Sequence, residues 1–120
     1  MTTRDVLDEI IAERARQIDR HDHAAERDDR HPLAAWGWLL GRRASELACP
    51  YEDALPDPRR VLVEIAAIAV AAIESIDRKT ADGFGPWSSV GTITAPDGTV
   101  ALVSFVGEII PEAVAPEELR

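Results

Sequence analysis

One segment of this 120-residue chain constrains the fold more than any other, the stretch RRVLVEIAAIAVAAIESIDR at residues 59–78. Between positions 61 and 73 every residue except Glu64 is apolar. The stretch predicts a helix over about 58–79, since Pro58 suits a first helical turn and glycines follow shortly after the end. A helix that is apolar around most of its circumference must be covered on several sides. Other elements, or another copy of the chain, must therefore pack against it.

Two further helices are predicted upstream of this segment. Apolar residues recur at helical spacing over about 3–20, after a capping-box pattern at the start. A second apolar stripe at the same spacing begins at Pro32 and is stopped by Pro50. The connection at 21–31 has no apolar periodicity, and we interpret it as a polar loop. The helical part is therefore an all-α bundle with three main helices.

The C-terminal part changes character. Two runs of β-branched residues flank the turn-forming sequence APDG, which predicts a β-hairpin with strands at 90–94 and 99–106. A two-stranded hairpin is only marginally stable in water. We therefore expect a helical domain at 1–82 and a hairpin extension at 83–110 that packs on the helices or on a partner subunit. The acidic segment 111–120 is predicted to be a loose tail.

Charge and composition narrow the classes of function. Thirteen basic against 22 acidic side chains give a formal net charge of −9. A broad nucleic-acid-binding surface is therefore not expected, and an anionic ligand would need a local basic pocket or a metal. The longest wholly apolar run, 65–73, is far shorter than the roughly 18 residues of a membrane span. The lone Cys49 and an N-terminus without a signal-peptide core favour a cytoplasmic protein.

The apolar third helix also bears on the state of assembly. Three helices and one hairpin in so small a chain cover this helix poorly. A homo-oligomer, a dimer or a tetramer with the third helix central to a shared bundle, would bury it fully. The alternative is a monomer in which the hairpin covers the remaining face.

Glu64 stands alone among apolar residues, and a carboxylate in such a place must be solvated, paired, protonated or bound. One interpretation is that it faces Glu46 of the second helix, and that the two carboxylates hold magnesium or manganese. The other is that Glu64 lies at a helix edge and pairs with an arginine. The His- and Asp-rich stretches 21–23 and 28–31 are metal-like in composition, but they are typical of caps and solvated loops.

Three segments taken together carry a resemblance to a known family: VLDEIIAERARQ, HPLAAWGWLLGRRASELA and RRVLVEIAAIAVAAIESIDR. They resemble the MazG-like all-α nucleoside triphosphate pyrophosphohydrolases, in particular the small phage and actinobacterial branch. The resemblance covers about residues 6–79 and does not extend to the hairpin. It implies that carboxylates on two helices hold magnesium, which binds a nucleoside triphosphate. Water then cleaves between the α and β phosphates, giving a monophosphate and pyrophosphate.

The family pattern places E-x-x-E on the second helix and E-x-x-D on the third. In this chain the first motif falls on Arg43 and Glu46, and the second on Val61 and Glu64. Only the latter member of each pair is acidic, so the four positions carry −1 where four carboxylates would carry −4. The departure suggests that Arg43 occupies the place of the metal.

The resemblance implies a set of site residues. Glu46 and Glu64 would be the catalytic, metal-ligating residues, and the nucleotide would be contacted by Glu13, Gln17, Arg78 and Lys79. Three hypotheses remain open. The protein is a pyrophosphohydrolase, or it keeps the fold without catalysis as a binding or regulatory module, or it serves assembly through strand pairing of the hairpin with a partner.

Overall fold

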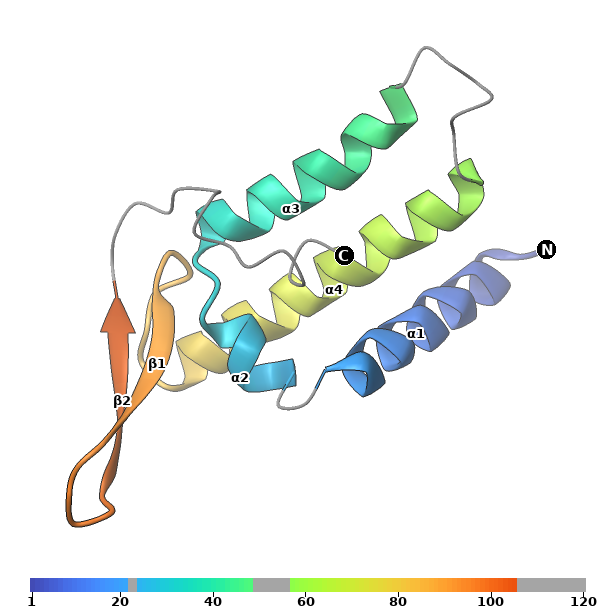
Figure 1. Cartoon of the computed structure of the whole chain (residues 1–120). Helices are drawn as coiled ribbons and strands as arrows, with labels where there is room; N and C mark the ends of the chain where they lie inside the picture. Colours follow the sequence, from blue (N-terminus) through green and yellow to red (C-terminus); the bar gives the residue numbers. More distant parts are fainter. Residues whose placement is uncertain (22–23, 49–56, 106–120) are drawn as a thin grey trace.

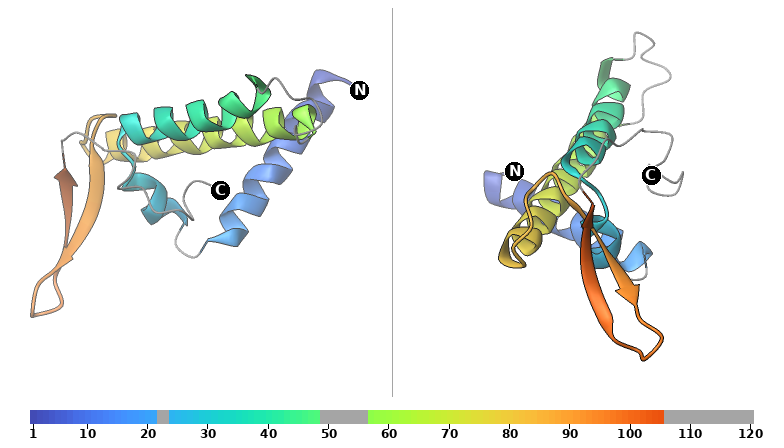
Figure 2. Two further views of the ribbon diagram at one scale, coloured as in Figure 1. Left: turned by 45° about the horizontal axis from the view of Figure 1, so that its top comes forward. Right: turned by 90° about the vertical axis from the view of Figure 1, so that its left-hand side faces the viewer.

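The structure, a computed structural model, describes residues 1–21, 24–48 and 57–105. Its elements, in chain order, are α1 (Thr3–Arg20), α2 (Ala24–Asp29), α3 (Leu33–Ser45), the 3-10 turn η1 (Glu46–Ala48), α4 (Pro58–Ala81), β1 (Ser89–Thr94) and β2 (Val100–Phe105). Helices α3 and α4 lie side by side and antiparallel, and α1 crosses α4 near its N-terminal half (Figures 1 and 2). The hairpin stands at the opposite end of α4 (Figure 1).

The sequence-based fold is confirmed in its coarse form, as a mostly helical protein with a C-terminal hairpin. The first helix has the predicted bounds, and α4 runs two residues beyond the predicted end at 79. The strands match their predicted ranges to within one residue at each end. The tail at 111–120 and Cys49 lie outside the described residues.

Local capping fixes where α1 and α4 begin. Thr2 and Asp5 form a capping box, in which the Thr2 hydroxyl accepts from the Asp5 amide and the Asp5 carboxylate accepts from the Thr2 amide. Asp57 accepts a hydrogen bond from the Arg59 amide at 3.0 Å, and Pro58 opens α4. These side chains satisfy amide groups that a helix start leaves without partners.

The apolar core lies between α3 and α4. Trp36 and Leu39 of α3 are buried against Ala71 and Ala72 of α4, and two partly buried residues, Trp38 and Ile68, pack against this cluster. Small alanine side chains on α4 allow the bulky side chains of α3 to fit between the two helices. This cluster joins α3 to α4 and contains no residue of α1.

The connection at 21–31 is polar as predicted, but it is not a loop throughout, because residues 24–29 form α2. Polar contacts hold this short helix against α1 and α4. Asp29 accepts from the Ser75 hydroxyl at 2.8 Å and from Arg78 Nη2 at 2.9 Å, and Asp28 pairs with Arg14 at 3.2 Å. Helix α2 lacks apolar periodicity since it docks through its carboxylates, so the usual sequence signal is absent.

The hairpin is antiparallel, with Ser89 opposite Phe105 and Thr94 opposite Val100. Gly98 in the turn has a φ of +88°, a conformation that glycine adopts without steric cost. The tip of the hairpin extends away from the helices (Figure 1), so only its base contacts the helical body.

Lys79 anchors the base of the hairpin to the helices. Its side chain is 1% exposed, and its Nζ donates to the carbonyl oxygens of His31 at 2.9 Å and Ser88 at 2.6 Å. Burial lowers the pKa of Lys79 below its ordinary value. This one ammonium group therefore joins α4, the segment before α3 and the start of the hairpin.

One face of α4 stays exposed in the single chain. Leu62, Val70 and Ile73 are 55%, 36% and 58% exposed. The expected homo-oligomer through this helix stays a prediction, and these side chains are the ones that it would cover. Among the described residues, no helix is both long enough and apolar enough to cross a membrane.

Replacing Lys79 by methionine keeps most of the side-chain volume and removes the donor to both carbonyl groups. We expect Lys79→Met to lower the free energy of unfolding by about 1 to 3 kcal/mol, the usual effect of leaving buried acceptors without a donor. Urea denaturation measures this, with Thr80→Ala at the next, exposed position as the control. Since the pKa of Lys79 is lower in the folded state than in the unfolded state, the deficit should grow as the pH is raised through the alkaline range. Equal stability of the two variants would contradict the anchoring role.

Candidate functional site

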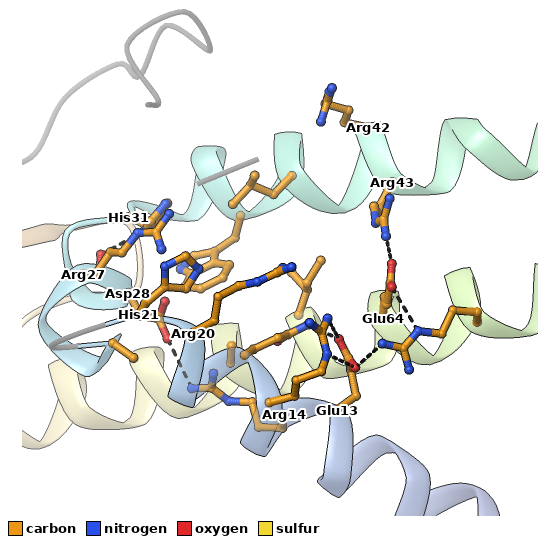
Figure 3. A pocket seen from close by; sticks show the side chains of 18 of the residues that line it. Glu13, Arg14, Arg20, His21, Arg27, Asp28, His31, Arg42, Arg43 and Glu64 are labelled. Carbon is orange, nitrogen blue, oxygen red and sulfur yellow. Dashed lines mark hydrogen bonds and ion pairs between the residues drawn. The ribbon is translucent and has the colours of Figure 1, made fainter. Parts of the chain in front are cut away.

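A cavity of about 530 Å³ lies between the four α-helices (Figure 3). Seven arginines line it, from α1 (Arg14, Arg16 and Arg20), α2 (Arg27), α3 (Arg42 and Arg43) and α4 (Arg60). Four carboxylates line it as well, those of Glu13, Asp28, Glu46 and Glu64. The lining is therefore positive, although the chain as a whole carries −9. This is the local basic pocket that an anionic ligand would need in such an acidic protein.

Glu13 is the most deeply placed of these carboxylates, with a side chain that is 1% exposed. It accepts hydrogen bonds from Arg16 Nε at 2.8 Å, from Arg60 Nη2 at 2.7 Å and, more weakly, from Gln17 Nε2 at 3.4 Å. Hydrogen bonding to Arg16 is the main reason that the pKa of Glu13 lies below its ordinary value. A buried charge is stable here because cationic donors satisfy both of its oxygens.

Glu64 is held by arginines from two directions. Arg60 Nε donates to it at 3.2 Å along α4, and the Nη2 of Arg43 reaches it from α3 (Figure 3). The Nη1 of Arg43 also donates to both carboxylate oxygens of Glu46, each at 2.9 Å. The interpretation of Glu64 as the partner of an arginine is therefore confirmed.

Together these contacts form an ionic ladder, in which carboxylates and guanidinium groups alternate. In order across the cavity wall its members are Glu46, Arg43, Glu64, Arg60, Glu13 and Arg16. The ladder has no net charge, so the positive excess of the cavity comes from the remaining arginines.

Part of the cavity lining is apolar. Leu39, Ile68 and Ala71 belong to it together with Trp36, which is 4% exposed and whose ring is tilted by 37° to that of His31, with centroids 5.0 Å apart. Trp36 Nε1 is buried, and no described residue accepts a hydrogen bond from it. A flat apolar group would fit beside these side chains.

Asp28 differs from the other carboxylates that line the cavity. Burial raises its pKa, and the nearby Arg14 guanidinium, at 3.2 Å, opposes that shift. Arg14 also pairs with Glu74 at 2.8 Å, so it connects α1 to both α2 and α4. The pair of Arg14 and Asp28 therefore forms part of the cavity wall.

The structure brings four of the predicted site residues together and leaves two elsewhere. Glu46, Glu64, Glu13 and Gln17 all line the cavity. Arg78 and Lys79 do not line it, and their contacts are with Asp29 and with two backbone carbonyl groups. Their role in nucleotide contact stays a prediction, while the contacts that they make here are structural.

A magnesium ion needs several oxygen ligands around one point. Here the carboxylates of Glu46 and Glu64 are directed at Arg43, whose guanidinium lies between them. Within the described residues there is no group of three or more His, Cys, Asp or Glu side chains that could hold a metal ion. This arrangement does not fit a resident magnesium ion.

Sequence reasoning missed Arg16, Arg60 and Trp36 as members of the site. For the two arginines a signal existed, since Arg16 follows Glu13 by three positions and Arg60 precedes Glu64 by four, both neighbouring spacings on a helix. For Trp36 no signal distinguished a cavity wall from ordinary core packing.

Comparisons of the chain with models of known protein families, with curated protein sequences and with solved structures give no match. The MazG-like resemblance therefore rests on the sequence motifs alone.

Glu13→Gln tests the ionic ladder at its most buried point. Removing one charge leaves two guanidinium groups without their partner, which we expect to cost on the order of 3 to 5 kcal/mol in unfolding free energy. Since the pKa of Glu13 is lowered in the folded state, this contribution is present at neutral pH and is lost as the pH falls through that pKa. The difference between wild type and variant should therefore shrink in acid.

Glu9→Gln is the matched control, because Glu9 makes a similar two-point contact with Arg59, at 2.5 and 2.7 Å, on the exposed side of the same helix. Solvent screens that pair, so Glu9→Gln should lower the free energy of unfolding much less than Glu13→Gln does. Chemical denaturation at several pH values measures both variants. If Glu9→Gln lowers the free energy of unfolding as much as Glu13→Gln does, burial does not increase the contribution of the ladder to stability.

Proposed function

We propose that the protein binds a nucleotide in the cavity between the helices, with arginines contacting the phosphate groups. The observation that carries this proposal is the lining of seven arginines and four carboxylates in a chain of net charge −9. Guanidinium groups bind phosphate oxygens in pairs, which gives both attraction and orientation. The volume of about 530 Å³ lies within the range of small-molecule sites.

Apolar members of the cavity lining favour a nucleotide over a simple phosphate. The arginines suit the phosphate groups, and Trp36, Leu39 and Ile68 suit an aromatic base. A ligand that is anionic in one part and aromatic in another matches both.

Arg20 is the arginine whose contribution to binding is easiest to isolate. It lies in the last turn of α1, lines the cavity, and makes no ion pair with any described residue. Figure 3 shows its side chain extending across the cavity. A guanidinium that does not already serve a carboxylate is available to a phosphate at no loss to the ladder.

Hydrolysis by the MazG-like route is the second candidate function. One observation favours it, namely that Glu46 from η1 and Glu64 from α4 converge on a single point, as the resemblance implies. The same point is filled by Arg43, which would have to leave before the two carboxylates could serve in catalysis. We therefore place binding first, with the protein as a binding or regulatory module.

Arg20→Gln tests the binding proposal. A charge-assisted hydrogen bond contributes roughly 1.5 to 3 kcal/mol, so the variant should bind ATP or another nucleoside triphosphate roughly tenfold or more weakly. Isothermal titration calorimetry at low and high salt measures this, because screening should weaken wild-type binding as well. Arg4→Gln is the control, since Arg4 lies on the same helix with its side chain 85% exposed and outside the cavity. An equal effect of the two substitutions, or no binding across a panel of nucleotides, would refute the proposal.

Pyrophosphate release from common and modified nucleoside triphosphates, with and without magnesium, separates the two candidates. A binding module releases no pyrophosphate while it still binds nucleotide. A pyrophosphohydrolase releases it in a magnesium-dependent manner, and Glu64→Gln abolishes the reaction. Nucleotide affinity of Glu64→Gln should be measured alongside, so that loss of binding is not mistaken for loss of chemistry.

A further inference from the structure

The Arg43 contacts define a binding mode that differs from the one the family resemblance implies. We propose that Arg43 is a built-in cation that replaces a divalent metal, so that this site holds its phosphate ligand without a resident metal ion. The proposal deepens the nucleotide-binding function and rests on it for the identity of the ligand. Its first part, the exclusion of the metal, concerns the protein alone.

The geometry of Arg43 is the main support. Its Nη1 donates to both oxygens of Glu46, each at 2.9 Å, and its Nη2 pairs with Glu64 of the neighbouring helix. A divalent ion that joined α3 and α4 at this point would need these same carboxylate oxygens. Figure 3 shows Arg43 reaching down from α3 to Glu64, with no other side chain between them. The guanidinium therefore already makes the helix-to-helix connection that a metal would make.

The surroundings of Glu64 strengthen the point. Arg60 donates to Glu64 at 3.2 Å and also to Glu13 at 2.7 Å, so the neighbouring carboxylates are neutralised as well. The ionic ladder contains three carboxylates and three guanidinium groups. A divalent ion added to it would meet no excess of negative charge and would lie beside fixed positive groups. Electrostatics here disfavours the ion that a four-carboxylate site requires.

The exchange of a metal for a guanidinium has a consequence for the ligand. Guanidinium does not lose its proton in proteins and cannot dissociate from the site. Its remaining N–H groups can bind phosphate oxygens directly. The ligand class is therefore a nucleotide whose phosphates enter without magnesium, and its affinity should not rise when magnesium is added.

The decisive experiment titrates the full chain with Mn²⁺ and no nucleotide, with free Mn²⁺ followed by electron paramagnetic resonance. The wild type should have no Mn²⁺-binding site that depends on Glu64, so Glu64→Gln should leave its Mn²⁺ binding unchanged. Arg43→Glu gives three carboxylates at this point in place of two carboxylates and a guanidinium, and it should bind Mn²⁺ at least about tenfold more tightly than the wild type. Arg42→Glu is the matched control, because it makes the same charge change at the neighbouring position of the same helix and on the lining of the same cavity.

Each outcome decides the question. Mn²⁺ binding to the wild type that is lost in Glu64→Gln overturns the proposal, as does an Arg43→Glu affinity no higher than that of Arg42→Glu. Circular dichroism checks that each variant is folded. If Arg43→Glu is not folded, Arg43→Gln is measured in its place, and it should still bind Mn²⁺ more tightly than the wild type; an affinity equal to that of the wild type overturns the proposal.

A second arm addresses the ligand. Binding of ATP to the wild type should be at least as tight in EDTA as in excess magnesium, and a strict requirement for magnesium would overturn the metal-free mode. If no nucleotide binds under either condition, the proposed function fails while the Mn²⁺ result still decides the role of Arg43. The two failures are therefore distinguishable.

Discussion

The structure depends on the ionic ladder, and above all on Glu13 at its buried end. A carboxylate with a side chain 1% exposed is tolerated only because Arg16 and Arg60 satisfy it. Such a pair adds little net stability compared with apolar packing, yet losing one partner is costly. The ladder therefore determines how α1 is placed on α4 more than how stable the protein is. Since Arg43 continues the ladder to α3, the same contacts also shape the cavity.

The placement of α1 illustrates the point, because most of its large apolar side chains are exposed. Leu7, Ile11 and Ile18 are 49%, 65% and 42% exposed, and the apolar cluster of the core lies between α3 and α4. What joins α1 to its neighbours is a series of ion pairs that includes Arg14 with Asp28 and with Glu74. A helix held in this way leaves an open space beside it, lined by charged side chains. The cavity is a direct result of ionic docking in place of apolar docking.

The sequence predicted the features that depend on near neighbours in the chain. Helix starts followed from capping residues such as Asp57, the hairpin followed from its turn formers, and the motif comparison placed Arg43 where a metal would be expected. What it could not predict were contacts between distant segments. Arg60 and Glu13 lie 47 positions apart, and nothing in their spacing indicates that they meet. Helix α2 was missed for a similar reason, since the contacts of Asp29 with α4 span 46 to 49 positions.

The ladder and the ligand share one set of donors, and this links binding to stability. A phosphate that enters the cavity can bind the N–H groups of Arg43 that the carboxylates leave unused, whereas it takes an N–H group that already serves a carboxylate only in competition with that carboxylate. Glu13 accepts from the most donors and is the most buried of the three carboxylates. The phosphate therefore competes mainly with Glu46 and Glu64, which are more exposed. The positive excess outside the ladder supplies the attraction that offsets this competition. A ligand held in this way stabilises the folded chain by mass action, and it also draws α1 toward the helices to which ion pairs join it.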